Sequence, residues 1–250
     1  MQLVVDIGNT TEKAALFKGD TLIQVYKPGK IDAKILEEII GENSISAWII
    51  SSVTNVRQEL SGIFSQYAKG IVFDHTTPLP VVNSYATPET LGKDRLANVI
   101  GAWKLMPGTN VLVVDAGTCI KCDFISSEGK YLGGSISPGL AMRFKAMHNF
   151  TAMLPHIPAE KYNAPVSIAL TGNSTETALI AGGAMGAVFE VQKTIDEYHK
   201  IYDNLKVILT GGDALFFDYH MKNRIFALPD LTLIGLNTVL EYNSRNFNAN

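Results

Sequence analysis

Positive charge and long apolar runs are both scarce in this chain. It has 21 lysines and arginines against 24 aspartates and glutamates, a net charge of −3, and its basic residues form no cluster. Duplex nucleic acid is therefore not expected as a partner, since binding it needs a basic face. No apolar run is long enough to span a bilayer, so no membrane partner is expected. The apolar start of the chain lacks a preceding basic region and is interrupted by Asp6 and Asn9, which predicts a strand and not a signal peptide.

Cysteine is scarce too, with only Cys119 and Cys122 present. Two cysteines so close together argue against a disulfide framework and favour a reducing cytoplasm as the compartment. Their C-x-x-C spacing falls in an expected strand, where residues three apart point to opposite faces. No second such pair is present to complete a zinc site, and the five histidines lack ligand spacing. No metal site of cysteine or histidine is expected.

What the chain does contain is two copies of one short pattern. An apolar strand runs into Asp6 and Gly8 near the start, and a second apolar strand, Val111–Val114, runs into Asp115 and Gly117. With 46% apolar residues, a chain of 250 residues can build two modest cores. The repeated D-x-G therefore predicts an α/β protein of two similar lobes that face each other across a phosphate-binding cleft.

Hydrophobic periodicity and turn residues divide each lobe into strands and helices. The first lobe, residues 1–108, is predicted to begin with an antiparallel meander, and the second, residues 109–250, repeats that plan. We leave open whether the last helix of the second lobe packs back on the first. The expected strands are 2–7, 12–17, 21–26, 45–53, 71–73, 111–114, 119–125, 131–136 and 207–210. Three helices are expected over residues 32–40, 175–201 and 233–242. Three more are expected to begin at Asn55, at residues 92–95 and at Pro138–Gly139, and the second of these ends at Pro107–Gly108.

The first D-x-G turn has the residue types of a phosphate site. A carboxylate at the end of a strand, Asp6, can hold a hydrated Mg²⁺ that bridges ATP phosphates. Gly8 lets backbone N–H groups approach the phosphate oxygens. Thr10, Thr11 and Lys13 can donate further hydrogen bonds. The alternative is an Asx turn that only connects two strands, and the second copy of the pattern favours the phosphate site.

The second D-x-G turn and a G-K-D-R segment add further polar groups. Asp115 could bind a cation and Thr118 a phosphate, although a plain β-turn with Asp in first place has the same sequence. Residues 92–95 precede apolar residues at helical spacing, so they begin a helix. Asp94 could accept the proton of a substrate hydroxyl, and Arg95 could clamp a carboxylate or phosphate with two hydrogen bonds. The alternative is an N-capped helix with a solvated arginine.

Other segments are less specific. Residues 211–214, G-G-D-A, follow a strand, and their small size could let an adenine ring lie on the backbone. Thr175 stands at the start of the long helix, where a hydroxyl is the usual cap. Gly182, Gly183 and Gly186 inside that helix let a backbone or ligand approach closely, at some cost in helix stability.

In this order, the segments resemble those of type III pantothenate kinases, a family of the actin-like and sugar-kinase ATPase superfamily. The resemblance runs from Met1 to about Tyr242. Each motif is weak alone, and seven in this order are specific. They are D-I-G-N-T-T-E-K at 6–13, G-K-D-R at 92–95, D-A-G-T at 115–118, G-G-S-I-S-P-G at 133–139, T-A-M-L-P at 151–155, G-N-S-T at 172–175 and T-G-G-D-A at 210–214.

The resemblance implies two ribonuclease H-like lobes, each a mixed sheet flanked by helices, with a cleft between them. It implies transfer of the ATP γ-phosphate to the primary hydroxyl of pantothenate, the first step of coenzyme A biosynthesis. Its cofactors would be Mg²⁺ with ATP and a monovalent cation, K⁺ or NH₄⁺, held by Asp115. It also implies a homodimer whose substrate pocket is shared across the subunit contact. The ATP-binding residues that it implies are Asp6, Ile7, Gly8, Asn9, Thr10, Thr11, Glu12, Lys13 and Thr118.

For pantothenate, the resemblance implies Asp94 as the catalytic base. One position departs from the family pattern, because Lys121 stands where a threonine is common. If Lys121 faces the cleft, the preference for nucleotide or cation could change. The pantothenate pocket that the resemblance implies is lined by Tyr85, Gly92, Lys93, Asp94, Arg95 and Thr175.

Three other functions fit parts of the pattern. A phosphatase or nucleotide hydrolase of the same superfamily would need a carboxylate that positions water and no closed pocket for an organic acceptor. A non-catalytic accessory protein, such as a helper of transcription, would bind DNA or protein, and the missing basic patch argues against DNA. An actin-like filament protein would sediment with ATP. The combined motifs favour the kinase.

Overall fold

The computed structural model describes residues 1–52, 60, 62–63, 66, 68–163, 165–221 and 225–247. Contacts between residues divide the chain into two compact units. The first contains Met1–Gly108, Ser127–Leu132 and Asp230–Asn250, and the second contains Thr109–Ser126 and Gly133–Pro229. The start of the helix predicted at Asn55 lies outside the described residues. Within the described part of the chain, no helix is both long and apolar enough to cross a bilayer.

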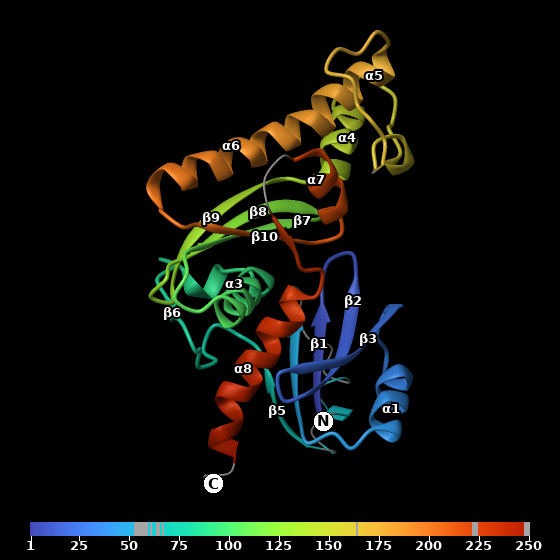
Figure 1. Cartoon of the computed structure of the whole chain (residues 1–250). Helices are drawn as coiled ribbons and strands as arrows, with labels where there is room; N and C mark the ends of the chain where they lie inside the picture. The colour runs from blue at the N-terminus through green and yellow to red at the C-terminus, as the bar shows by residue number, and fades with distance from the viewer. Residues whose placement is uncertain are drawn as a thin grey trace. The chain divides into compact units, whose positions relative to one another are not determined.

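A five-stranded mixed sheet forms the centre of the first unit (Figure 1). Its order is β3-β2-β1-β4-β5, in which β1–β2 and β2–β3 are antiparallel and β1–β4 and β4–β5 are parallel. Leu3, Val4 and Val5 of the central strand are all fully buried, as expected for a strand covered on both faces. The strands are β1 (Gln2–Ile7), β2 (Glu12–Lys18), β3 (Thr21–Gly29), β4 (Ala47–Ser52) and β5 (Lys69–Val72).

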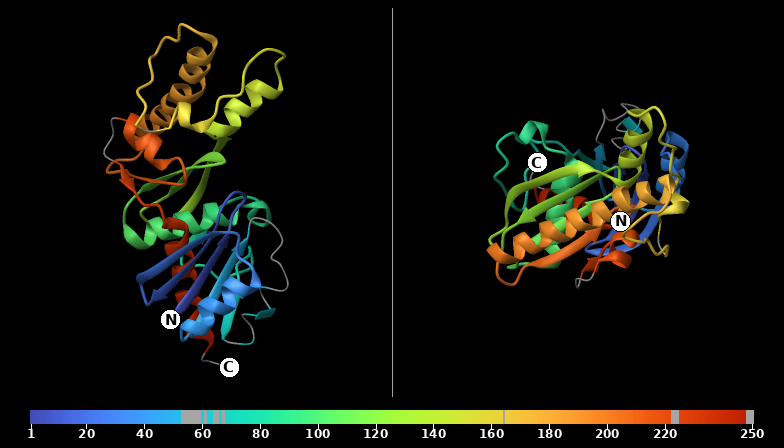
Figure 2. Two further views of the ribbon diagram at one scale, coloured as in Figure 1. Left: turned by 90° about the vertical axis from the view of Figure 1, so that its right-hand side faces the viewer. Right: turned by 90° about the horizontal axis from the view of Figure 1, so that it is seen from above.

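Helices cover both faces of this sheet. On one face, α1 (Ala33–Glu42) is capped by Asp32, whose carboxylate accepts the N–H of Ile35 at 3.0 Å. Leu36 of α1 and Leu3 of β1 are both buried in the same hydrophobic cluster. On the other face, α8 (Leu231–Phe247) packs against β1, β4 and β5 (Figure 2). The residues after Asp230 thus complete the core of the unit in which the chain begins.

Two glycines bring α3 (Lys93–Leu105) and α8 into close contact. A Cβ added at Gly235 of α8 would lie 1.8 Å from the backbone oxygen of Ala97, and one added at Gly101 of α3 would lie 2.6 Å from the oxygen of Leu231. No side chain fits between the two helices at these points. The position of α3, which begins with the G-K-D-R segment, is therefore fixed by α8.

The second unit is built on a sheet with the order β11-β10-β7-β8-β9. In it, β7–β8 is antiparallel, whereas β7–β10 and β10–β11 are parallel. The short β6 (Val82–Asn83) pairs with the first residues of β9, Lys130 and Tyr131, which belong to the first unit. The strands are β7 (Val111–Ala116), β8 (Cys119–Ile125), β9 (Lys130–Pro138), β10 (Lys206–Thr210) and β11 (Phe226–Ala227). The α-helices are α4 (Leu140–Asn149), α5 (Thr175–Ile180), α6 (Gly186–Ile201) and α7 (Ala214–His220), and 3₁₀ turns cover Pro88–Thr90 and Ala159–Lys161.

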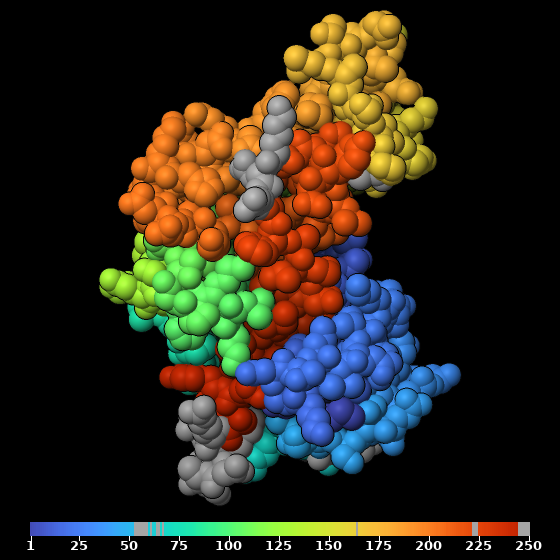
Figure 3. Space-filling model, in the orientation of Figure 1, coloured from blue at the N-terminus to red at the C-terminus, as the bar shows by residue number. Residues whose placement is uncertain are grey.

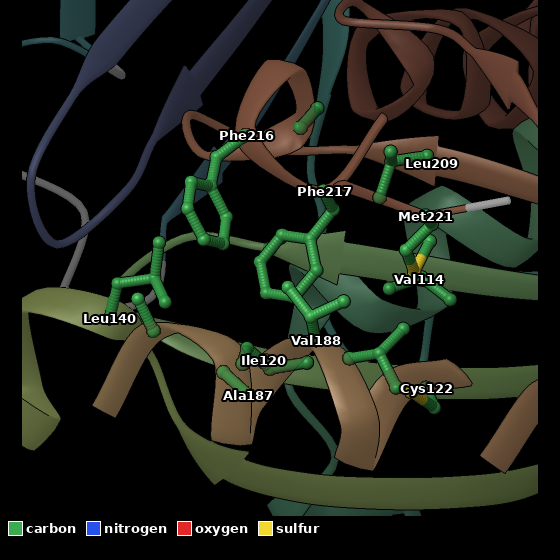
Figure 4. Close-up of a cluster of buried hydrophobic side chains, with 14 of the residues drawn as sticks. Val114, Ile120, Cys122, Leu140, Ala187, Val188, Leu209, Phe216, Phe217 and Met221 are labelled. Atoms are coloured by element: carbon green, nitrogen blue, oxygen red, sulfur yellow. The ribbon is translucent and has the colours of Figure 1, made fainter. Parts of the chain in front are cut away.

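The core of the second unit lies between its sheet and its helices. Figure 4 shows Val188 of α6 and Phe217 of α7 in one buried cluster with side chains of β7, β8 and β10, and Cys122 belongs to this cluster. Burial raises the pKa of the Cys122 thiol to about 12, so the residue behaves as a small apolar side chain. Cys119, three residues earlier on the strand, is also a free cysteine. The two mixed sheets flanked by helices confirm the predicted α/β fold class.

The helix predicted over residues 175–201 is interrupted. It consists of α5, a π-helical turn at Ala181–Met185, and α6, which forms an outer layer of this unit (Figure 3). A Cβ added at Gly183 in the turn would lie 2.7 Å from a ring carbon of Phe144 on α4. The extent of the helix was predicted correctly, but not its regularity, because a π turn adds a residue without ending the helical pattern.

Candidate active site

The first D-x-G segment forms the hairpin between β1 and β2. Asp6 is half-buried near the end of β1, and the N–H of Gly8 donates to the oxygen of Thr11 at 3.0 Å. A Cβ on Gly8 would lie 2.9 Å from that oxygen, so the tight turn favours glycine. Ile7 is buried, whereas the turn leaves three polar residues exposed, which are Asn9, Thr10 and Thr11.

Two charged side chains at the start of β2, those of Lys13 and Glu12, have different partners. Lys13 stands directly opposite Asp6 in the β1–β2 register, and its Nζ lies 3.6 Å from Oδ1 of Asp230. The Glu12 carboxylate accepts the N–H of Ile31, just before α1 begins. Glu12 therefore already contributes to the local structure, whereas the predicted phosphate contacts at Thr10 and Thr11 lie on the exposed turn.

The second D-x-G segment forms the hairpin between β7 and β8, and two other loops pack against it. The N–H of Gly139 donates to the oxygen of Thr118 at 3.2 Å, and a Cβ on Gly139 would lie 2.0 Å from the oxygen of Gly117. A Cβ on Gly211 would lie 2.6 Å from Oδ1 of Asp115. The S-P-G and T-G-G-D segments, far apart in the sequence, thus hold this turn in place.

Asp115 has a cationic partner on the next strand. The antiparallel register places Lys121 of β8 directly opposite Asp115 of β7. The distance from Lys121 Nζ to Asp115 Oδ2 is 2.7 Å, and the two side chains are only 15% and 14% exposed. This short, largely buried ion pair occupies the position where the sequence predicted a cation site.

The G-K-D-R segment starts α3. Asp94 lies in the first helical turn, where its Oδ1 accepts the N–H of Arg95 at 2.9 Å. A carboxylate in this position is favoured by the positive end of the helix dipole. A Cβ on Gly92 would lie 2.7 Å from the same oxygen, so glycine leaves room for the Asp94 carboxylate. Gly92, Lys93 and Asp94 are all half-buried.

Arg95 is buried under an aromatic stack. It is only 4% exposed, and its guanidinium carbon lies 5.4 Å from the ring centroid of Tyr85, within the range of a cation–π contact. Arg95 Nη1 also lies 3.4 Å from the Tyr85 hydroxyl. The Tyr85 ring stacks on Tyr131, with centroids 6.0 Å apart and ring planes at 12°. The structure therefore brings together two predicted pantothenate contacts, Tyr85 and Arg95.

Tyr131 is a residue that the sequence analysis missed. The pairing of β6 with β9 places Asn83 opposite Tyr131, and the Tyr85 N–H donates to Asn83 Oδ1 at 3.1 Å. These contacts hold Tyr85 over the Tyr131 ring. No local motif marks Tyr131, because its role depends on the pairing of segments far apart in the sequence.

Thr175 belongs to the second unit and lies at the first position of α5. The helix is capped by Ser174, whose hydroxyl accepts the N–H of Thr177 at 3.2 Å. The expectation that Thr175 stands at the cap is therefore off by one residue, and its side chain is exposed.

Asp213, from the T-G-G-D-A segment, is partly buried, and this burial raises its carboxyl pKa to about 6. In the described residues, no group of three or more His, Cys, Asp or Glu could hold a metal ion.

Comparison with known proteins identifies relatives that span the chain. The family described as type III pantothenate kinase matches residues 2–197. The protein named type III pantothenate kinase from Phocaeicola vulgatus is 42% identical over 246 residues, which are 98% of this chain and 100% of that protein.

Solved structures share the fold at low identity. A Campylobacter jejuni protein described as a Baf family transcriptional activator has a TM-score of 0.61 at 22% identity and covers 97% of this chain and 99% of its own. An activator of 2-hydroxyisocaproyl-CoA dehydratase from Clostridium difficile, solved with bound ADPNP, has a TM-score of 0.57 at 12% identity and covers 99% of this chain and 97% of its own. At such identities, the likeness establishes the actin-like ATPase fold and not a function.

Proposed function

Since the chain belongs to the type III pantothenate kinase family, we propose that it transfers the γ-phosphate of ATP to the primary hydroxyl of pantothenate in the cytoplasm. The observation that carries this proposal is the start of α3. There a carboxylate held by a backbone N–H, Asp94, is followed directly by a buried guanidinium, Arg95. A carboxylate suits a hydroxyl group that must lose its proton, and a guanidinium suits a carboxylate. Pantothenate has both a hydroxyl and a carboxylate.

In the proposed reaction, Asp94 orients the pantothenate hydroxyl and takes its proton. Arg95 holds the pantothenate carboxylate, and Tyr85, Gly92 and Lys93 line the same pocket. The stack of Arg95 on Tyr85 supports this role, because it fixes the guanidinium plane before substrate binds. Thr175 is proposed as a further substrate contact.

ATP is proposed to bind through the first hairpin, residues 6–13. Its turn presents the hydroxyls of Thr10 and Thr11, and the Gly8 turn brings backbone groups near the phosphates. Thr118 of the second hairpin is a further proposed ATP contact. Phosphoryl transfer depends mainly on such positioning and on neutralised charge.

Mg²⁺ fits the first hairpin. The hairpin offers oxygen ligands, which are the half-buried carboxylate of Asp6 and the exposed hydroxyls of Thr10 and Thr11. Mg²⁺ in phosphoryl-transfer enzymes is commonly held by one or two carboxylates together with the substrate phosphates. Asp6 is the residue that would hold it. The ion would supply positive charge to the β- and γ-phosphates of ATP.

The monovalent cation that the resemblance implies at Asp115 does not fit the residues present. Oδ2 of Asp115 lies 2.7 Å from the ammonium group of Lys121, and the backbone at Gly211 stands close to Oδ1. We therefore assign no step of the reaction to such a cation.

A homodimer is proposed because the second unit exposes large apolar side chains. Phe150 and Met153, which follow α4, are 88% and 89% exposed, and Leu170 is 75% exposed. Leu170 and Phe189 of α6 line an open groove beside the π turn. Burying such a surface against a second copy is favourable.

The test of the kinase is pantothenate-dependent ADP formation in a coupled assay. The Asp94→Asn variant is expected to fold and to lose about 10²–10⁴-fold in kcat, the usual contribution of a general base. Asp203→Asn, the same change at an exposed aspartate, is the matched control. Normal turnover of Asp94→Asn at saturating ATP and pantothenate would remove Asp94 from its proposed role. ADP release that ignores pantothenate would indicate a nucleotide hydrolase instead.

A further inference from the structure

The ion pair of Lys121 with Asp115 has a consequence for the kinase. We infer that the ammonium group of Lys121 is a resident cation: it supplies, from within the chain, the positive charge that the resemblance assigns to K⁺ or NH₄⁺ at Asp115. The proposed kinase is then independent of monovalent cations. This inference rests on the proposed function and names a further residue of its nucleotide-binding hairpin.

The geometry of the hairpin places the ammonium group at the carboxylate. Residues 115 and 121 are directly opposite each other on antiparallel strands, so their side chains leave the same face of the sheet as neighbours. The 2.7 Å distance between Lys121 Nζ and Asp115 Oδ2 is that of a charge-assisted hydrogen bond. A primary ammonium and a free ammonium ion present the same type of donor, N–H, and the same charge to a carboxylate.

The surroundings keep the pair in place. Both side chains are less than one-sixth exposed, so dissolved salt screens their attraction much less than it would at the surface. The backbone at Gly211, with φ of +94°, lies against the other carboxylate oxygen, and Gly139 lies against the turn that joins the strands. Neither strand of the hairpin can therefore move away easily.

A cation from solution could bind Asp115 only by displacing Lys121. Displacement would leave a lysine ammonium largely buried without its carboxylate, and breaking a buried pair in this way is strongly unfavourable. K⁺ is therefore expected neither to compete with Lys121 nor to add to it. The charge at this position is part of the fold and does not vary with the ionic composition of the solution.

The first experiment measures the unmodified protein after exchange into tetramethylammonium buffer free of K⁺, Na⁺ and NH₄⁺. Its rate of pantothenate-dependent ADP formation is titrated with KCl, and tetramethylammonium chloride keeps the ionic strength constant. The Kd for ADPNP with Mg²⁺ is measured calorimetrically in the same solutions. We expect both the rate and the Kd to stay unchanged. Activation by K⁺, or tighter ADPNP binding in K⁺, would overturn the inference.

The second experiment removes the resident cation by the change Lys121→Thr. Without K⁺, this variant is expected to lose about 10²-fold in rate, comparable to the loss of one preorganised electrostatic group. K⁺ or NH₄⁺ should then restore the rate and tighten ADPNP binding, because a threonine leaves room for an ion beside Asp115. Full activity of Lys121→Thr without K⁺ would contradict the inference, as would a loss in a folded variant that neither ion repairs.

Lys193→Thr is the matched control. It removes a lysine whose Nζ lies 2.6 Å from Glu197 Oε1 on the exposed side of α6, so it changes the same residue type in the same unit. Its activity and its indifference to K⁺ should match those of the unmodified protein. If Lys121→Thr does not fold, the titrations of the unmodified protein decide the question alone.

The two proposals fail in different ways. If no solution supports pantothenate-dependent ADP formation, the proposed function is wrong, and the effect of K⁺ on ADPNP binding still tests Lys121. If activity is present but requires K⁺, the kinase stands and the resident cation does not.

Discussion

Replacing Gly235 by alanine should disturb the helix that begins with the proposed catalytic residues. The added Cβ would lie 1.8 Å from the backbone oxygen of Ala97 on α3, whereas ordinary contact begins at 3.4 Å. A backbone oxygen cannot rotate aside as a flexible side chain could. The helices α3 and α8 would therefore have to separate at this point.

The cost can be worked from two opposing effects. Overpacking of a core costs about 1–3 kcal/mol, and the collision with backbone at Gly235 places this case at the upper end. Alanine returns about 1 kcal/mol through its higher helix propensity. The net loss is about 2 kcal/mol, which for a chain of this size lowers Tm by about 4–8 °C. Because Asp94 lies on the same helix as Ala97, kcat should fall as well, since a shift of about 1 Å can cost about 10²-fold.

Thermal unfolding followed by circular dichroism, together with the ADP assay, tests this prediction. Gly41→Ala is the control, because Gly41 also lies in a helix, α1, and a Cβ there meets no atom within 4 Å. Gly41→Ala should keep or raise the Tm and leave activity unchanged. If Gly235→Ala melts at or above the Tm of the unmodified protein, the close packing of α3 on α8 is not what positions the site.

Three further predictions concern single groups. Arg95→Lys keeps the charge but loses the planar guanidinium over Tyr85, so it should raise the KM for pantothenate more than that for ATP in the ADP assay; a change confined to the ATP KM would exclude the proposed clamp. Burial raises the pKa of Asp213 from 3.8 to about 6 in the folded protein. Between pH 3.8 and pH 6 the folded state therefore binds more protons than the unfolded state, and the stability of the protein falls as the pH rises through this range. The Tm of Asp213→Asn minus that of the unmodified protein should therefore increase from pH 4 to pH 7 and stay constant above pH 7. A Tm difference that does not vary with pH would contradict burial as the cause of the raised pKa. Phe189→Glu replaces an apolar side chain beside the π turn, 51% exposed, by a charged one. It should shift the protein from dimer to monomer in light scattering. If the unmodified protein is already a monomer, the proposed dimer is wrong.

Much of the fold follows from local pattern. The strands of both hairpins were predicted nearly to the residue, because each apolar run is followed within a few residues by a glycine that favours a turn. The start of α3 was also predicted, since apolar residues at helical spacing follow Asp94 and Arg95. These features depend on residues close together in the sequence.

What could not be predicted depends on residues far apart in the sequence. Tyr131 supports Tyr85 only because β6 pairs with β9, and nothing near either tyrosine indicates that pairing. The π turn at Ala181–Met185 leaves the apolar periodicity almost intact, so a regular helix was the natural expectation. The ion pair of Lys121 with Asp115 was within reach, since a hairpin around Gly117 already places the two residues opposite each other.

The placement of α8 has a consequence for synthesis on the ribosome. Since α3 rests on α8 through Gly235, the first unit lacks its final layer until the residues after Asp230 have emerged. Residues 109–229 contain the whole of the second unit and are made before that layer. The second unit can therefore reach a folded state while the first unit is still incomplete. A nascent chain halted just before Asp230 should therefore resist protease over its later half while its beginning is digested, and release of the last helix should convert the whole chain to the resistant form.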